Sequence, residues 1–97
     1  MPEELNNLEK TVLAHLTIHH RIQPSEPTVV KIFGGDQGLR RKTLTSLRDR
    51  GYIQHFRRAL DNIEFICPSD TGDLIGRNMI HAARKGSWQP ENISLGE

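Results

Sequence analysis

The chain has 97 residues, of which 35% are hydrophobic and 26% charged, and its formal net charge is +1. This length suffices for one domain with a modest core and excludes a core combined with a deep enzyme cleft. No apolar run approaches the ~20 residues of a membrane-spanning helix, and the acidic, polar beginning MPEELNN is not a signal peptide. The single cysteine, Cys67, is typical of a reducing compartment, so we expect a cytoplasmic protein.

The first segment, residues 2–22, is predicted to be a helix. Its apolar residues recur three and four positions apart, at Leu5, Leu8, Val12 and Leu16. Glu3 and Glu4 would lie in the first turn, where the helix dipole favours acidic side chains. Pro24 and Pro27 then prevent the helix from continuing.

The second segment, TVVKIF (residues 28–33), is short, and four of its six residues are apolar. Pro27 suits the first turn of a helix, and Ser25 or Glu26 would precede it as a cap. We expect a short buried helix, with a strand as the alternative. The following GGD permits a sharp turn.

The third segment, residues 36–50, is predicted to be a helix that begins at the N-cap Asp36 and ends before Gly51. Helical spacing divides its side chains into two faces. The face expected to meet the core carries Leu39, Thr43, Leu44 and Leu47. The opposite face carries Arg41, Lys42, Thr45 and Arg48.

The rest of the chain is predicted to form a hairpin, a helix and a tail. Residues 52–58 and 63–67 are rich in β-branched and aromatic residues and flank the turn-forming ALDN. A helix over residues 68–86 would be capped by Ser69 or Thr71, with Asp70 and Asp73 in its first turn. We therefore expect one domain over residues 1–86 and a polar tail over 87–97 that docks through Trp88.

Charge is distributed unevenly along the chain. Residues 37–58 contain seven basic residues and one acidic residue, a net charge of +6, whereas the remaining residues carry −5. A basic segment on an acidic body is typical of a surface that binds a polyanion. A solvated helix face is the alternative explanation.

Two passages, KTLTSLRDRGYI at the end of the third segment and PSDTGDLI at the start of the last predicted helix, resemble those of winged helix-turn-helix transcriptional regulators. These include the MarR-like and PadR-like families and small archaeal and phage repressors. KTLTSLRDRGYI resembles the end of their recognition helix, through Leu44, Leu47, Gly51, Tyr52 and Ile53. PSDTGDLI resembles the start of the helix after the wing, although Thr71 directly precedes Gly72. The resemblance covers residues 11–79 and implies an α+β fold with a three-helix core, a β-hairpin wing and a C-terminal helix.

This resemblance implies a sequence-specific regulator of transcription that binds double-stranded DNA. The helix over residues 36–50 would lie in the major groove, and the wing over 52–67 would contact the flanking backbone. The residues expected to contact DNA are Gln37, Arg40, Arg41, Lys42, Thr45, Arg48, Arg57 and Arg58.

The last predicted helix has a wider apolar arc than one core contact needs, which is typical of a partner surface. We expect a homodimer formed through Leu74, Met79, Ile80 and Ala83. A two-fold pair would place two recognition helices ~34 Å apart, one turn of DNA. The alternative is that the Trp88 tail folds back and covers the arc.

Other functions have weaker support in the sequence. A plasmid or phage accessory factor for partition, excision or replication would bind DNA in the same way, and some winged helices are protein-interaction modules. His15 and His19 are four residues apart, but no carboxylate or cysteine joins them at matching spacing, so we expect no metal site. Cys67 is expected to pack as a small apolar residue. No paired acid and base indicates catalysis, and no cofactor is expected.

Overall fold

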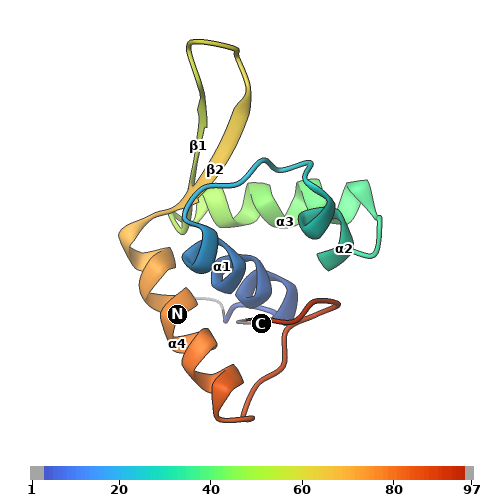
Figure 1. Cartoon of the computed structure of the whole chain (residues 1–97), viewed down its shortest axis with the longest axis vertical. Helices are drawn as coiled ribbons and strands as arrows, with labels where there is room; N and C mark the ends of the chain where they lie inside the picture. The colour runs from blue at the N-terminus through green and yellow to red at the C-terminus, as the bar shows by residue number, and fades with distance from the viewer. Residues whose placement is uncertain (1–3, 96–97) are drawn as a thin grey trace.

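The computed structural model describes residues 4–95 of the chain. Within them the order of elements is α1 (Asn7–His19), α2 (Pro27–Ile32), α3 (Gln37–Asp49), β1 (Ile53–Arg57), β2 (Glu64–Pro68) and α4 (Asp70–Arg84). The helices form the body, and the antiparallel hairpin of β1 and β2 projects from it (Figure 1). This architecture confirms the predicted α+β class, and residues 27–32 are helix rather than strand.

The predicted caps set the bounds of α3 and α4. The side chain of Asp36 accepts a hydrogen bond from the backbone N–H of Leu39 at 3.0 Å. The hydroxyl of Ser69 accepts one from the backbone N–H of Gly72 at 3.1 Å. Gly51 follows α3 with a φ of +81°, a conformation that glycine adopts without strain. These bonds satisfy N–H groups that the helix itself leaves unpaired.

The first helix is shorter than predicted because a capping box starts it later. Asn6 accepts a hydrogen bond from the N–H of Glu9 at 2.8 Å, and Glu9 accepts one from the N–H of Asn6 at 2.9 Å. Glu4 therefore lies before the helix and not in its first turn, and Glu3 lies outside the described residues. The helix ends at His19 because His20 has a φ of +63°.

The core lies between the three N-terminal helices and the base of the hairpin. Its buried side chains include Val12, Leu13, Leu16, Val29, Ile32, Leu44, Leu47, Ile53 and Ile66. Leu39 departs from the prediction, since 36% of it is exposed. It lies in the first turn of α3, at an open hollow that Leu8 and Phe33 also line, and so outside the closed core.

Helix α4 packs directly against α1 at Gly76, which is buried. A Cβ at Gly76 would lie 2.5 Å from the carbonyl oxygen of Leu13 and closer still to the hydroxyl of Thr17. The two helices approach each other this closely because this position carries no side chain. Gly72, one turn earlier and also buried, packs instead against the backbone carbonyl of Tyr52.

A backbone bridge links the segment after α1 to the hairpin. Ile22 donates to the carbonyl of Ile66 at 3.0 Å and accepts from its N–H at 2.8 Å. The sequence indicated only a break between helices here. The bridge holds the base of the hairpin against the helical body.

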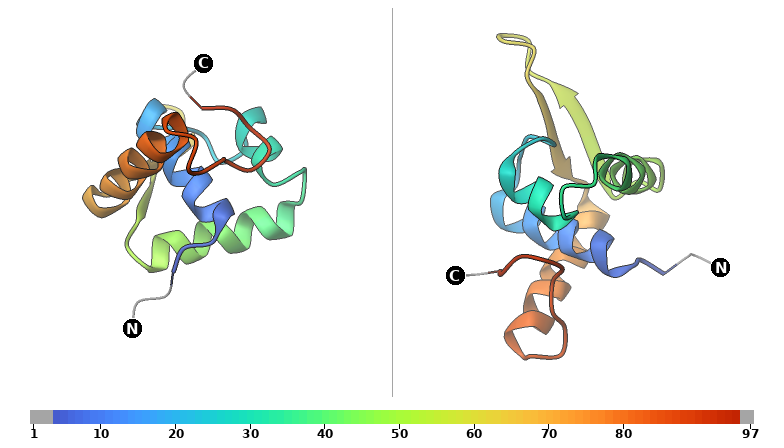
Figure 2. Two further views of the ribbon diagram at one scale, coloured as in Figure 1. Left: turned by 90° about the horizontal axis from the view of Figure 1, so that it is seen from below. Right: turned by 90° about the vertical axis from the view of Figure 1, so that its right-hand side faces the viewer.

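The tail docks as predicted, through Trp88 and two neighbouring contacts. Trp88 Nε1 donates to Asn7 Oδ1 at 2.6 Å, and the N–H of Glu91 donates to the hydroxyl of Thr11 at 2.9 Å. Asn92 Nδ2 donates to the carbonyl of Ile32, the last residue of α2, at 2.9 Å. The tail thus runs back across α1 to α2 (Figure 2).

The histidines of α1 have a partner that spacing did not predict. His15 Nε2 lies 3.1 Å from Glu26 Oε1, and the His15 and His19 rings are 4.5 Å apart. Burial lowers the pKa of His15, and the hydrogen bond with Glu26 opposes that shift. In residues 4–95 no three or more His, Cys, Asp or Glu side chains are grouped to hold a metal ion.

No helix within residues 4–95 is long and apolar enough to cross a membrane.

Candidate nucleic-acid interface

Helix α3 presents a basic face to solvent. Thr43, Leu44 and Leu47 are buried. Because these residues face the core, Arg41, Lys42 and Arg48 on the other side of the helix are exposed. Figure 2 shows α3 end-on, beside the base of the hairpin.

Four of the eight predicted DNA contacts line one groove between α3 and the hairpin. These are Arg40, Arg41, Thr45 and Arg48. From the other side the groove is closed by Pro24, His55 and Glu64. The three guanidinium groups give it a positive charge that suits a phosphate or the acceptor edge of a base.

His55 and Glu64 are groove residues that the sequence reasoning missed. His55 Nδ1 lies 3.7 Å from Glu64 Oε2, and His55 Nε2 is buried without a hydrogen-bond partner in the described chain. The alternation of side chains along each strand could have indicated both residues. His55 is two residues after the buried Ile53, and Glu64 is two residues before the buried Ile66. Side chains two residues apart on a strand share one face of the hairpin.

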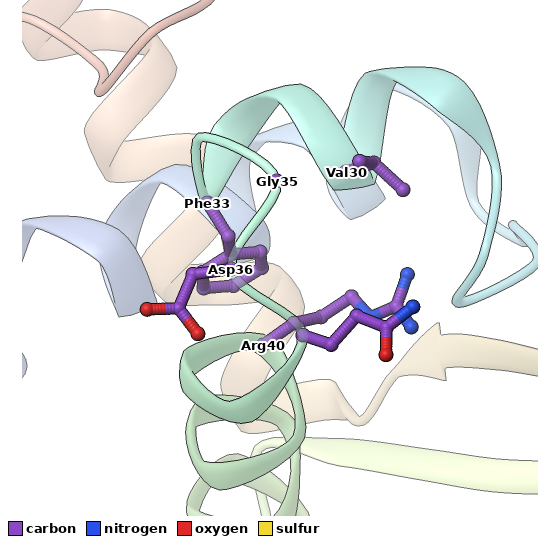
Figure 3. A pocket seen from close by; sticks show the side chains of 6 residues that line it. Val30, Phe33, Gly35, Asp36 and Arg40 are labelled. Atoms are coloured by element: carbon purple, nitrogen blue, oxygen red, sulfur yellow. The ribbon is translucent and has the colours of Figure 1, made fainter.

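The start of α3 forms a second, smaller cavity with the end of α2. Val30, Phe33 and Gly35 line it from α2 and the turn, and Gln37 and Arg40 from α3. Asp36 and Arg40 point to opposite sides of this turn (Figure 3). Gln37 thus lies outside the main groove, as does the exposed Lys42.

One arginine of the basic segment points into the protein. Arg50 Nη1 lies 3.1 Å from Glu9 Oε2, and its guanidinium lies over the ring of Tyr52. The carboxylate of Glu9 is buried and also accepts a hydrogen bond from Ser46. Arg50 therefore contributes to the fold and not to the basic face. Arg48, in contrast, forms an exposed ion pair with Asp49 at 3.5 Å, which is weak in water.

The two arginines of the wing differ in their surroundings. Arg57 is exposed and donates to the carbonyl of Asn62 at 3.3 Å. Arg58 Nε donates to Asp61 Oδ1 at 3.0 Å, and its guanidinium lies over the ring of Phe65. The hydrogen bond between Arg58 and Asp61 raises the pKa of Arg58 and lowers the pKa of Asp61. Asp61 compensates the charge of Arg58, whereas the acceptor of Arg57 is neutral.

The residues predicted for dimerisation lie along α4. Leu74 is 61% exposed, and Met79, Ile80 and Ala83 are half-buried. The tail approaches this arc at one end, where Ala83 shares a hollow with Trp88. It leaves Leu74, in the first half of α4, exposed.

Comparison with known proteins identifies the fold. No family model and no curated sequence matches the chain. Among solved structures, the adhesin competence repressor AdcR of Streptococcus pyogenes matches with a TM-score of 0.73 and 15% identity, over 86% of this chain and 60% of AdcR. A mutant of ZitR from Lactococcus lactis matches with a TM-score of 0.75 and 11% identity, over 89% of this chain and 57% of ZitR. A mutant of MarR from E. coli, complexed with operator DNA, matches with a TM-score of 0.65 and 17% identity, over 77% of this chain and 53% of MarR.

The chain thus spans 60% or less of the length of these three proteins. Its order of elements, with α2 and α3 separated by a tight turn and followed by an antiparallel hairpin, agrees with theirs. The identities of 11–17% are a likeness of fold. The chain has the winged helix-turn-helix fold, in which α2 and α3 form the helix-turn-helix and the β1–β2 hairpin is the wing.

Proposed function

We propose that the protein is a cytoplasmic transcriptional regulator that binds a specific double-stranded DNA site. The observation that carries this proposal is the groove between α3 and the wing, where Arg40, Arg41 and Arg48 converge with Thr45. The fold supplies a helix that enters the major groove, and the MarR structure with operator DNA supports that use of it. In this proposal residues 1–86 form the DNA-binding domain, and residues 87–97 are a tail docked on it.

The contacts divide into two kinds. Arg41, Thr45 and Arg48 on α3 would reach base edges, where arginine reads guanine through two hydrogen bonds. Arg57 and Arg58 on the wing, with Lys42 on α3, would contact phosphates, which position the protein without reading sequence. Gln37 and Arg40, near the start of α3, would contact bases or backbone at one end of the site.

The proposal is tested by selecting binding sites from a pool of random duplexes and then titrating the selected duplex in increasing salt. Log K should fall linearly with log salt, with a slope of about −0.9 for each contacted phosphate. If no duplex is enriched, or if affinity does not depend on salt, the protein does not bind DNA in this way.

Substituting single arginines should separate base reading from positioning. We expect Arg41→Ala to weaken binding to the selected duplex by about 1–3 kcal/mol more than binding to random DNA, because a lost bidentate contact affects only the correct base. Arg57→Ala serves as the matched control and should weaken both duplexes equally. Fluorescence anisotropy measures both affinities. Equal losses for Arg41→Ala would mean that α3 does not read bases.

We also propose that the regulator is a homodimer formed through α4, with Leu74, Met79, Ile80 and Ala83 in the interface. The exposure of Leu74 and the half-buried arc beside it support this proposal. A two-fold axis through this surface would present two recognition helices to neighbouring turns of DNA.

Light scattering at micromolar concentration tests the dimer. We expect the wild type to have twice the mass of the chain and the Met79→Glu, Ile80→Glu variant to be a folded monomer that binds DNA weakly. Because these two side chains are half-buried, Leu74→Glu provides a second test that cannot empty the core. A wild type that is monomeric, together with an unchanged Leu74→Glu variant, would contradict the dimer.

A further inference from the structure

The apex of the wing carries an apolar side chain that the described part of the chain leaves uncovered. Leu60 is 90% exposed. Among the large apolar residues of the range 4–95, Leu74 is exposed to 61%, and Ile18, Leu39 and Phe56 to little more than a third. Single exposed apolar residues are common on protein surfaces. Leu60 differs because it lies in the turn between β1 and β2, and this hairpin projects away from the body (Figure 1).

Side-chain and backbone contacts close the turn at the apex. Arg58 and Asp61 form a bidentate pair across it, and Asp61 Oδ1 also accepts from the N–H of Ile63 at 3.2 Å. The N–H of Asn62 donates to the carbonyl of Arg58 at 2.7 Å. Asn62 has a φ of +58°, a conformation that asparagine tolerates better than most residues. Leu60 is therefore presented by a closed turn.

The hairpin below the apex is also braced. Phe56 and Phe65 stack with their ring centroids 5.6 Å apart. The guanidinium groups of Arg21 and Arg58 each lie 5.1 Å from the centroid of the Phe65 ring. A braced hairpin loses little conformational freedom when its tip enters a binding partner.

We propose that Leu60 is a wedge that enters the minor groove of bound DNA and separates two stacked base pairs. The inference rests on the proposed function, because α3 in the major groove would bring the wing beside the duplex. The positive charge near the tip suits DNA as the partner. Arg57 is exposed, and its hydrogen bond to the neutral carbonyl of Asn62 leaves its charge uncompensated. Apolar side chains on such projections kink DNA by partial unstacking.

The wedge would determine part of the sequence preference without a hydrogen bond to a base. Pyrimidine–purine steps such as TA and CA unstack most easily. We therefore expect such a step under the wing in duplexes selected by the wild type, and no such preference in duplexes selected by Leu60→Ala.

The test uses the full chain and the selected duplex, with 2-aminopurine replacing one adenine at a time under the wing. Its fluorescence rises when the base is unstacked. We expect a several-fold rise at one step with the wild type and with Leu60→Phe, which keeps an apolar wedge, and none with Leu60→Ala. Leu60→Ala should also bind about tenfold more weakly, the loss expected for one large apolar side chain. Because Leu60 is 90% exposed, its removal leaves the fold intact, which circular dichroism verifies.

The outcomes separate the wedge from the proposed function. If the wild type binds no duplex, the proposed function itself fails. If the wild type binds but the 2-aminopurine fluorescence rises at no step, DNA binding stands and the wedge is wrong. The same conclusion follows if Leu60→Ala raises the fluorescence at the same step equally. If Leu60→Ala changes the mass in light scattering but not the fluorescence, the tip contacts a second copy of the chain, and the wedge is again wrong.

Discussion

Replacing Arg50 by methionine is expected to lower the free energy of unfolding by about 3 kcal/mol, because it leaves a buried carboxylate without its cation. Among the described residues, Glu9 would keep the hydrogen bonds from Asn6 and Ser46. Methionine retains much of the packing of the arginine stem against Tyr52, so lost volume contributes little. Urea denaturation followed by circular dichroism measures the change.

Arg48→Met is the matched control, two residues away in the last turn of α3. Arg48 is exposed, and its one ion pair within residues 4–95 is the weak pair with Asp49, so its loss should leave stability within ~0.5 kcal/mol and should weaken DNA binding. The double variant Glu9→Gln, Arg50→Met should recover much of the stability that Arg50→Met loses, because no unpaired buried charge remains. Equal destabilisation by Arg48→Met and Arg50→Met would show that the Glu9 contact is not what makes Arg50 structural.

Gly76→Ala is expected to destabilise the protein by about 3 kcal/mol, near the upper end for overpacking. The new methyl group would lie 2.5 Å from the carbonyl oxygen of Leu13 and would collide with Thr17. A backbone carbonyl cannot rotate away as a side chain does, so α1 and α4 would have to separate. The same denaturation experiment measures the loss.

The same substitution at Gly38 should have the opposite sign. Gly38 lies in the first turn of α3, and a Cβ there would be 3.5 Å from Asp36 Oδ1, an ordinary contact. Alanine restricts the unfolded chain more than glycine does, so we expect Gly38→Ala to stabilise by about 0.5 kcal/mol. The close-packing explanation would be refuted if Gly76→Ala unfolded at the same urea concentration as Gly38→Ala.

Elements with local signals could be predicted from the sequence alone. Asp36 and Ser69 cap the helices that begin beside them, and Gly51 ends α3, because each of these effects involves residues a few positions apart. The hairpin was likewise evident in two β-rich runs around a turn. The start of α1 was placed too early because the acidic residues before it resembled a first turn, whereas the reciprocal bonds of Asn6 and Glu9 begin the helix at Asn7.

Pairings between distant residues could not be predicted in this way. His15 meets Glu26 across a chain reversal, and Ile22 meets Ile66 through backbone atoms that carry no sequence signal. Leu39 has the spacing of a core residue, but it lies at an open hollow. Each of these depends on how the elements pack and not on the pattern within one element.

Periodicity, caps and charge are properties of neighbouring residues, so the elements, the basic segment and the likeness to winged helices follow from the order of residues. Which charges face solvent depends instead on how the elements pack. It pairs Arg50 with buried Glu9 and brings Arg40, Arg41 and Arg48 into one groove with the wing. A charge is neutralised or left free by the groups that surround it in space, and those groups come from segments that the sequence separates by up to 41 positions.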